Sequence, residues 1–184
     1  MIISLIRHGM TDANARRLYC GRTDLDLCEP GITELIILKN EIDYPAGEIY
    51  ATSGLKRAVS TLRILYGPVL SVSIPELAEY NFGDFEMKSH DELQHEKRYA
   101  DWIDNEDIRC PNGESRTEFY QRIKTGFNKL KIISGTVVCV CHGGVIASLM
   151  DFLFPGQKNF YEWQPRFGRG YAISAGVDID YEHI

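Results

Sequence analysis

"IISLIRHG" (residues 2–9) is the stretch on which the fold of this chain depends, because a nearly uninterrupted apolar run ends in an arginine, a histidine and a glycine. Apolar runs without polar alternation are typical of strands buried on both faces of a parallel sheet. The sequence therefore predicts a strand over residues 2–6, with Arg7 and His8 at its carboxyl end.

A second stretch far along the chain has the same form. In "GTVVCVCHGG" (residues 135–144), four β-favouring residues precede His142 and two glycines. His8 and His142 thus follow their predicted strands at equivalent positions.

Helical periodicity marks several segments between and after these strands. A short strand is predicted over residues 48–52, and helices over 53–67, 113–130 and 143–156. Ser115 and Glu118 form a capping-box pattern in the second of these helices. A further helix is expected after "LDLCEPG" (residues 25–31), but Cys28 is a poor N-cap, so its first turn stays open.

Strands that alternate with helices indicate an α/β fold, here a three-layer α/β/α sandwich around a mostly parallel sheet. Ligands of such sheets bind beyond the carboxyl ends of the strands, where both histidines are expected. Residues 75–113 carry many charges and aromatic rings with weak periodicity, so we expect an excursion over that edge as a lid. Residues 167–184 read as closing strands, and 1–184 as a single domain.

Composition narrows the class of protein. The chain has 184 residues, 44% of them hydrophobic, and a net charge of −6, which disfavours binding to nucleic acid through a broad basic surface. In the first loop, by contrast, several arginines give a local excess of positive charge, which suits a small anionic ligand. No apolar run reaches membrane-spanning length, no signal peptide is recognisable, and the five cysteines lack disulfide spacing. A cytoplasmic protein is expected, and a homodimer is left open.

Four segments, in order, resemble the motifs of the histidine phosphatase superfamily, whose members have the phosphoglycerate-mutase-like fold. They are "RHGMTDAN" (7–14), "SGLKRAVST" (53–61), "LAEYNFGDFE" (77–86) and "VCHGG" (140–144). The resemblance implies a phosphatase that acts on phosphate monoesters through a phosphohistidine, without a metal or another cofactor.

The resemblance also implies a role for each matching residue. His8 is the nucleophile, Glu79 the acid and later the base, and the catalytic set is completed by Arg7, Arg57 and His142. Substrate contacts are implied for Arg7, Asn14, Gly21, Arg57, His142 and Gly143, and Arg16 is a weaker candidate. The chemistry agrees, because a neutral imidazole attacks a phosphate dianion without repulsion, and guanidinium forks match phosphate oxygens.

Several alternatives stay open at this point. Glu76 and Glu86 compete with Glu79 as the acid. A histidine at a strand end can be purely structural, and Arg57 can be a solvated helix charge. Cys139, Cys141 and His142 do not have the geometry of a tetrahedral zinc site, since residues two apart on a strand share a face and the next residue does not.

A second resemblance, to one group within the superfamily, narrows the range of expected substrates. "FGDFEMKSHDEL" (82–93), with "PNGES" (111–115), resembles the alpha-ribazole phosphatase group of cobalamin biosynthesis, in which Met, here Met87, often stands where other members have Gly. The aromatic residues of this region either stack on the substrate's base or form the core of the lid: Tyr80, Phe82, Tyr99 and Trp102. A broad-specificity sugar-phosphate phosphatase, a mutase-like enzyme and a non-catalytic phosphate-binding protein are the alternatives.

Overall fold

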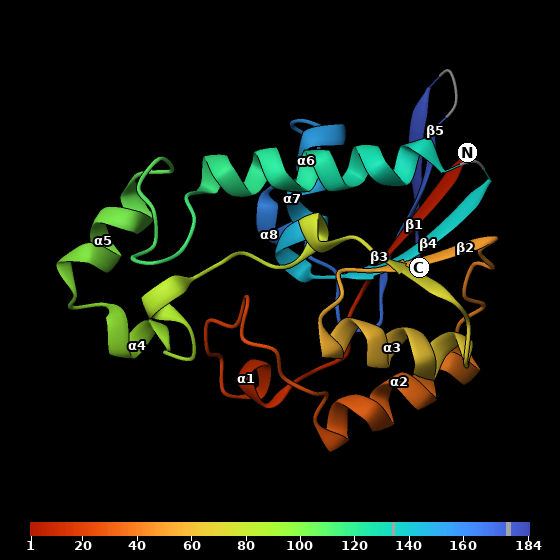
Figure 1. Ribbon diagram of the computed structural model, residues 1–184, viewed down its shortest axis with the longest axis horizontal. Coiled ribbons are helices and arrows are strands. Elements are labelled where there is room, and N and C mark those ends of the chain that lie inside the picture. The colour runs from red at the N-terminus through yellow and green to blue at the C-terminus, as the bar shows by residue number, and fades with distance from the viewer. Residues whose placement is uncertain (134, 176–177) are drawn as a thin grey trace.

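The computed structural model describes residues 1–133, 135–175 and 178–184, and its strands form one sheet in the order β3-β2-β4-β1-β5-β6 (Figure 1). The strands are β1 Ile2–Arg7, β2 Ile49–Thr52, β3 Ser71–Ser73, β4 Thr136–Cys141, β5 Gly170–Ala175 and β6 Ile179–His183. Strands β1 to β4 are parallel to one another, whereas β5 pairs antiparallel with both β1 and β6. The mostly parallel sheet is confirmed, and the closing strands lie on either side of residues 176–177, which are outside the described residues.

The register of the central strand pair, β1 and β4, decides where the two strand-end histidines lie. The strands pair from Ile2 with Thr136 to Arg7 with Cys141. The His8 amide then donates to the Cys141 carbonyl at 3.0 Å, one residue beyond the ladder. His8 and His142 therefore leave the sheet side by side.

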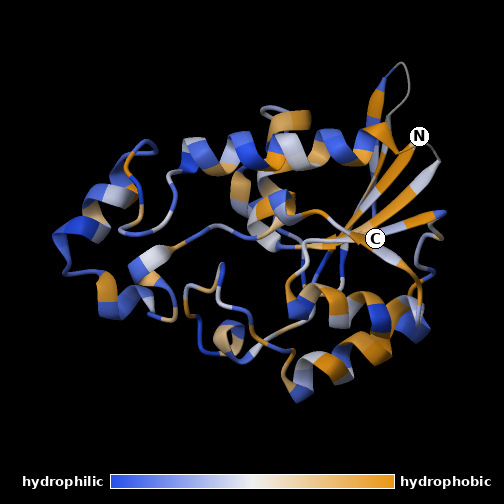
Figure 2. Cartoon of the chain, in the orientation of Figure 1, coloured by the Kyte–Doolittle hydropathy of each residue, from blue (hydrophilic) through white to orange (hydrophobic). Residues whose placement is uncertain are grey.

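Helices cover both faces of this sheet, as expected for a three-layer sandwich (Figure 1). One face carries α2 (Glu29–Glu41) and α3 (Lys56–Tyr66), and the other carries α6 (Arg116–Ile132), α7 (Gly143–Leu153) and α8 (Phe160–Trp163). Ile6 belongs to the core under α2 and α3, whereas Leu5 belongs to the core under α6 and α7. Alternate strand residues fill opposite cores, which explains the apolar runs coloured in Figure 2.

The helix starts depend on local turn and cap chemistry. The capping box of α6 is present, since the Ser115 hydroxyl accepts from the Glu118 amide and the Glu118 carboxylate accepts from the Ser115 amide. Helix α3 begins three residues later than predicted, because Gly54 turns the chain with a φ of +88°. Helix α2 does begin after Cys28, with no side-chain cap, and the thiol donates to the Met10 carbonyl instead.

Strand β3 was not predicted from the sequence. Leu70, Val72 and Ile74 alternate with two serines, a strand signal that the reasoning from sequence missed, although all three residues of the strand itself are exposed. It is an edge strand defined by its pairing with β2.

Residues 75–113 leave the sheet, as expected, and extend to the left in Figure 1. They contain the 3₁₀ turns η1 (Pro75–Leu77) and η2 (Gly83–Phe85) and the helices α4 (His90–Leu93) and α5 (Lys97–Asp104). The excursion is tied to the loop after α1 (Asp12–Ala15), because the Tyr19 amide donates to Lys88 and the Met87 amide donates to Tyr19. Met87 has a φ of +62°, the left-handed region that favours glycine. Motion as a lid stays a prediction.

The aromatic side chains of the excursion form its own core. Tyr80, Tyr99 and Trp102 are at most 6% exposed; Tyr99 and Trp102 pack on Phe85, and Tyr80 packs on Trp102. The Trp102 indole donates to the Tyr80 hydroxyl, which donates to the Glu114 carbonyl. The structure therefore favours the core interpretation for these three rings, and only Phe82 of the four is partly exposed.

No helix among the described residues is both long enough and apolar enough to cross a membrane.

Ser115→Ala should lower the free energy of unfolding by about 1 kcal/mol, because it leaves the Glu118 amide at the start of α6 without its acceptor. Urea denaturation followed by circular dichroism measures the change. Thr33→Ala, on the exposed side of α2, is the matched control and should stay within about 0.5 kcal/mol of wild type. Equal effects of the two substitutions would contradict the capping role.

Candidate active site

His8 lies directly after β1 and is almost completely buried, with 4% of its surface exposed. Its Nδ1 is 2.6 Å from the Gly9 carbonyl oxygen. Because a carbonyl only accepts, Nδ1 carries the proton, and a neutral imidazole then has its lone pair on Nε2. Burial, and next the positive charge of Arg57, hold the pKa of His8 well below its usual value. The side chain is therefore an uncharged imidazole at neutral pH.

His142 is the residue before the first turn of α7, and its ring centroid is 5.1 Å from that of His8. Its Nε2 is 2.7 Å from the Ser53 hydroxyl oxygen, whereas its buried Nδ1 has no hydrogen-bond partner in the described part of the chain. Burial, followed by the neighbouring His8 and Arg57, holds the pKa of His142 well below its usual value. His142 thus presents a polar nitrogen beside His8.

Arg57 is in the first turn of α3 and is 1% exposed, so its interpretation as a solvated surface charge is wrong. Its guanidinium donates to the carbonyls of Gly21 at 2.7 Å and Thr23 at 2.9 Å. The first loop is thereby fastened to α3, and a buried positive charge lies close enough to His8 to lower its pKa.

Arg7 is the last residue of β1, and its side chain contacts the segment after α8. Its Nη1 donates to the Pro165 carbonyl at 2.8 Å, and its guanidinium carbon lies 4.1 Å from the centre of the Phe167 ring. Its buried Nε has no partner among the described residues. A Cβ at Gly143 would lie 3.0 Å from the Arg7 Cζ, so glycine lets this guanidinium lie against the start of α7.

Glu79 reaches the same site from the excursion. One carboxylate oxygen accepts from the Gly144 amide at 2.9 Å, and the other accepts from the Tyr80 amide at 3.0 Å. Gly144 is in the first turn of α7, where the helix dipole favours a negative charge. Burial lowers the pKa of Arg7 and the charge of Glu79 raises it, which shows that the two groups are close.

The competing acids have other partners. Glu76 forms an ion pair with Lys129 on the surface. Glu86 accepts from the amides of Gly21, Arg22 and Thr23 and from the Thr23 hydroxyl, at 2.7–3.2 Å. Glu86 is thus a structural anchor for the loop that Arg57 binds.

The remaining predicted contacts are Gly21, Asn14 and Arg16. Gly21 has a structural role, since a Cβ there would be 1.5 Å from the Tyr80 carbonyl oxygen. The amide oxygen of Asn14 accepts from the amide and hydroxyl of Thr11, which leaves its NH₂ group as a donor. Arg16 is exposed after α1. Substrate contacts of these three residues stay predictions.

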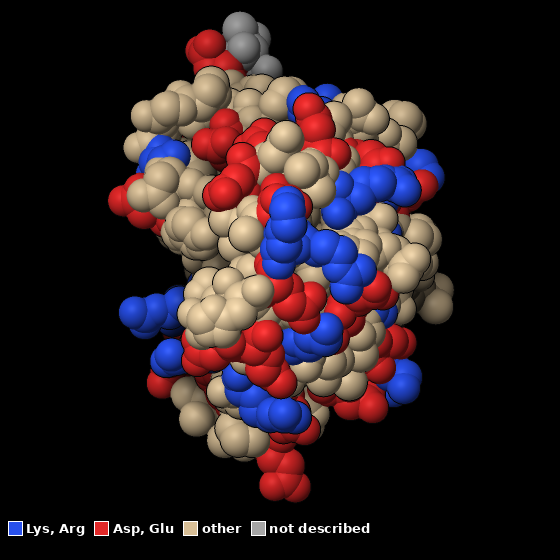
Figure 3. Space-filling view, turned by 90° about the vertical axis from the view of Figure 1, so that its left-hand side faces the viewer, with Lys and Arg blue, Asp and Glu red and all other residues tan. Residues whose placement is uncertain are grey.

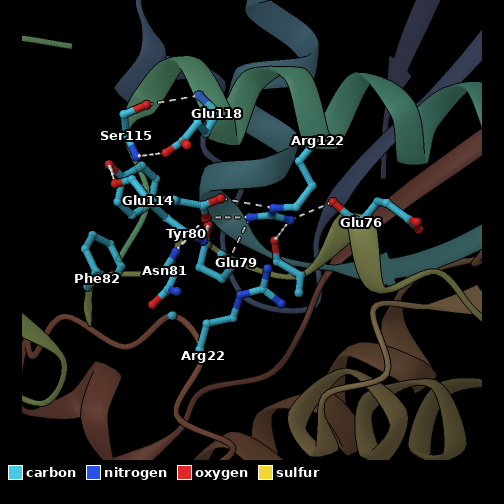
Figure 4. Close-up of polar contacts among 12 residues, drawn as sticks. Arg22, Glu76, Glu79, Tyr80, Asn81, Phe82, Glu114, Ser115, Glu118 and Arg122 are labelled. Atoms are coloured by element: carbon cyan, nitrogen blue, oxygen red, sulfur yellow. Dashed lines mark hydrogen bonds and ion pairs between the residues drawn. The ribbon is translucent and has the colours of Figure 1, made fainter. Parts of the chain in front are cut away.

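Two further residues near the site were missed by the reasoning from sequence. Ser53 binds His142, and its place in the "SGLKRAVST" segment was an available signal. Arg122 contacts the backbone around Glu79, and nothing local in the sequence distinguishes it from a surface charge. Arg22, one of the arginines of the first loop, lies below Glu79 in Figure 4.

Among known proteins, the family model described as the histidine phosphatase superfamily (branch 1) matches residues 3–167. The chain belongs to the histidine phosphatase superfamily. The residues of this histidine phosphatase that match the family model include both strand-end histidines, Arg7, Arg57 and Glu79.

Relatives and solved structures agree with this membership. The chain is 34% identical over 187 residues to the adenosylcobalamin/alpha-ribazole phosphatase of Escherichia coli, covering 98% of this chain and 91% of that protein. The structure of a putative alpha-ribazole-5′-P phosphatase from E. coli superimposes with a TM-score of 0.88 at 29% identity, covering 99% and 94% of the two chains. A phosphoglycerate mutase from Thermus thermophilus gives 0.76 at 26% identity, covering 98% and 96%. The phosphoglycerate-mutase-like fold is confirmed, and the enzyme is a phosphatase that acts through a histidine.

The two buried histidines should make the stability of this histidine phosphatase depend on pH. Their pKa values are lower in the folded protein, so below about pH 6.5 the unfolded chain binds protons that the folded chain does not. The free energy of unfolding should therefore fall as the pH drops from 7.5 to 5.5, by about 1 kcal/mol for each histidine.

Urea denaturation at the two pH values measures this effect. His8→Gln and His142→Gln should each reduce the difference between the two pH values, and the double substitution should reduce it further. A wild-type stability that is unchanged or higher at pH 5.5 would contradict the neutral, buried state of the pair.

Proposed function

We propose that this enzyme hydrolyses alpha-ribazole 5′-phosphate, with His8 as the nucleophile and Glu79 as the acid and base. The observation that carries the chemical part is the unprotonated Nε2 of His8, in a buried site that Arg7, Arg57 and His142 surround.

In the first step, Nε2 of His8 forms a bond to phosphorus while the bond from phosphorus to the ester oxygen breaks. Glu79 in its protonated form gives its proton to the departing alkoxide. The charge on the equatorial phosphoryl oxygens is stabilised by Arg7 and Arg57, and the unpartnered Nδ1 of His142 contacts the transferring group. The site is then left with a phosphohistidine and a Glu79 carboxylate.

In the second step, that carboxylate takes a proton from water as the water oxygen attacks phosphorus. The bond between phosphorus and Nε2 breaks, inorganic phosphate forms, and Glu79 is protonated again. The fixed arginines supply the positive charge in both steps, so no metal is required by this mechanism.

The substrate proposal is supported by the relatives. The names of the E. coli protein and of a Salmonella typhimurium protein, also 34% identical, both include alpha-ribazole phosphatase. Phe82 is partly exposed and follows Glu79 by three residues, and in this proposal it contacts the base of a nucleotide-like ester.

A mutase-like activity is the second candidate. It is supported by the similarity to the Thermus phosphoglycerate mutase, although the substrate of one relative does not transfer automatically to another member of the fold. A broad-specificity sugar-phosphate phosphatase is the third.

We also propose that the enzyme works in the cytoplasm on a small molecule rather than on nucleic acid. All five cysteines are free thiols, as a reducing compartment favours. On the face shown in Figure 3, acidic and basic side chains are interspersed and no broad basic field covers it. A homodimer stays a prediction, which light scattering during size-exclusion chromatography tests.

A panel of phosphate monoesters assayed in excess EDTA tests the substrate. Alpha-ribazole 5′-phosphate should have the highest kcat/KM, by about tenfold over 3-phosphoglycerate and common sugar phosphates. Uniform, slow hydrolysis would favour broad specificity, and conversion of 3-phosphoglycerate to its isomer would favour the mutase. Loss of activity in EDTA would contradict the metal-free mechanism.

The phosphoenzyme provides a second prediction. Rapid quenching in alkali during turnover of a ³²P-labelled ester should trap an acid-labile phosphohistidine on the wild type and none on His8→Asn, because that substitution removes Nε2. His95→Asn, at an exposed histidine, is the control and should label like the wild type. Labelling of His8→Asn would move the nucleophile to another residue.

A further inference from the structure

We propose that Arg122 and Glu114, a buried ion pair outside the phosphate site, are positioning residues that hold Glu79 where its proton transfer occurs. The inference rests on the proposed role of Glu79. It goes beyond that role, because neither residue faces the phosphoryl group in the mechanism above.

The guanidinium of Arg122, on α6, binds the backbone of the segment that carries Glu79 (Figure 4). Its Nη1 donates to the carbonyl of Glu76 at 2.7 Å and to that of Ala78 at 2.8 Å, and its Nη2 donates to the Glu79 carbonyl at 3.3 Å. One rigid group therefore binds three carbonyls within four residues.

Glu114 binds both the arginine and the other side of the segment. Its carboxylate accepts from Nε of Arg122 at 3.1 Å and from Nη2 at 2.6 Å, and it also accepts from the Asn81 amide at 2.7 Å. The Glu114 amide in turn donates to the Asn81 carbonyl at 3.1 Å. The backbone is thus held immediately before and after Glu79.

The catalytic carboxylate is consequently held between two helices. Its backbone carbonyl is bound to α6 through Arg122, and its carboxylate is bound to the first turn of α7 through the Gly144 amide. The segment around Glu79 has no partner in the sheet, so these contacts replace the ladder that fixes Arg7 and His8.

Stability alone is a weak explanation for this pair. The Arg122 and Glu114 side chains are 18% and 12% exposed. Burying two charges carries a desolvation penalty, and apolar replacements of such pairs are often equally stable. A defined geometry is what the pair supplies, because a guanidinium offers five donors in a fixed plane.

A leaving-group comparison separates positioning from general destabilisation. p-Nitrophenolate departs without a proton, whereas the alkoxide of ribose 5-phosphate needs one. For Arg122→Lys, which keeps the charge but not the planar fork, we expect kcat/KM to fall about tenfold or more for ribose 5-phosphate. The fall for p-nitrophenyl phosphate should be less than about threefold, and Glu79→Gln should show the same selectivity with a larger loss.

Arg109→Lys is the matched control. Arg109 forms a similar two-point pair with Glu118 of the same helix, but at the surface and without contact to the segment around Glu79. Both esters should be hydrolysed by Arg109→Lys at the wild-type rate.

Glu114→Gln keeps an acceptor for the Asn81 amide and removes the charge, so it serves as the second variant if Arg122→Lys does not fold. It should show the same leaving-group selectivity. Equal losses for both esters, or no loss, in a folded variant would overturn the positioning role while Glu79→Gln stays selective. Equal losses for both esters in Glu79→Gln would instead overturn the role of Glu79 itself.

Discussion

The parallel register of β1 with β4 is the constraint on which the rest of the structure depends. It places Arg7 opposite Cys141, so the residues that follow, His8 and His142, emerge together at one edge of the sheet. A slip of one residue would exchange the two faces of a strand and move its apolar side chains between the two cores. The same apolar packing that stabilises the sheet therefore also specifies the separation of the two histidines.

The arginines of the site contribute to the chemistry before any substrate arrives. Carbonyl oxygens of Gly21, Thr23 and Pro165 orient the buried guanidinium groups without neutralising them. Burial, and next the positive charge that remains, lower the pKa of His8 and keep its imidazole neutral. One electrostatic arrangement thus attracts a phosphate dianion and also maintains the form of histidine that can attack it.

Three carboxylates near the site have different tasks because they have different partners. Glu79 faces the first turn of α7 and Arg7, Glu86 binds the amides of the first loop, and Glu114 pairs with Arg122. As residue types they are equivalent acids. The different contacts of each follow from the donors that the fold brings to it.

The sequence by itself determined the features that depend on neighbours in the chain: the strand before His8, the strand before His142, the capping box of α6 and the ordered motifs with Arg57 and Glu79. Only the tertiary structure decided the others. The edge strand β3 is defined by its pairing with β2, and Tyr80, Tyr99 and Trp102, for which substrate contact and core were both open, are core. Ser53 and Arg122 gain their roles from partners 89 and 43 residues away. Such contacts leave no local periodicity, because burial and hydrogen bonding across the fold are set by how the elements pack.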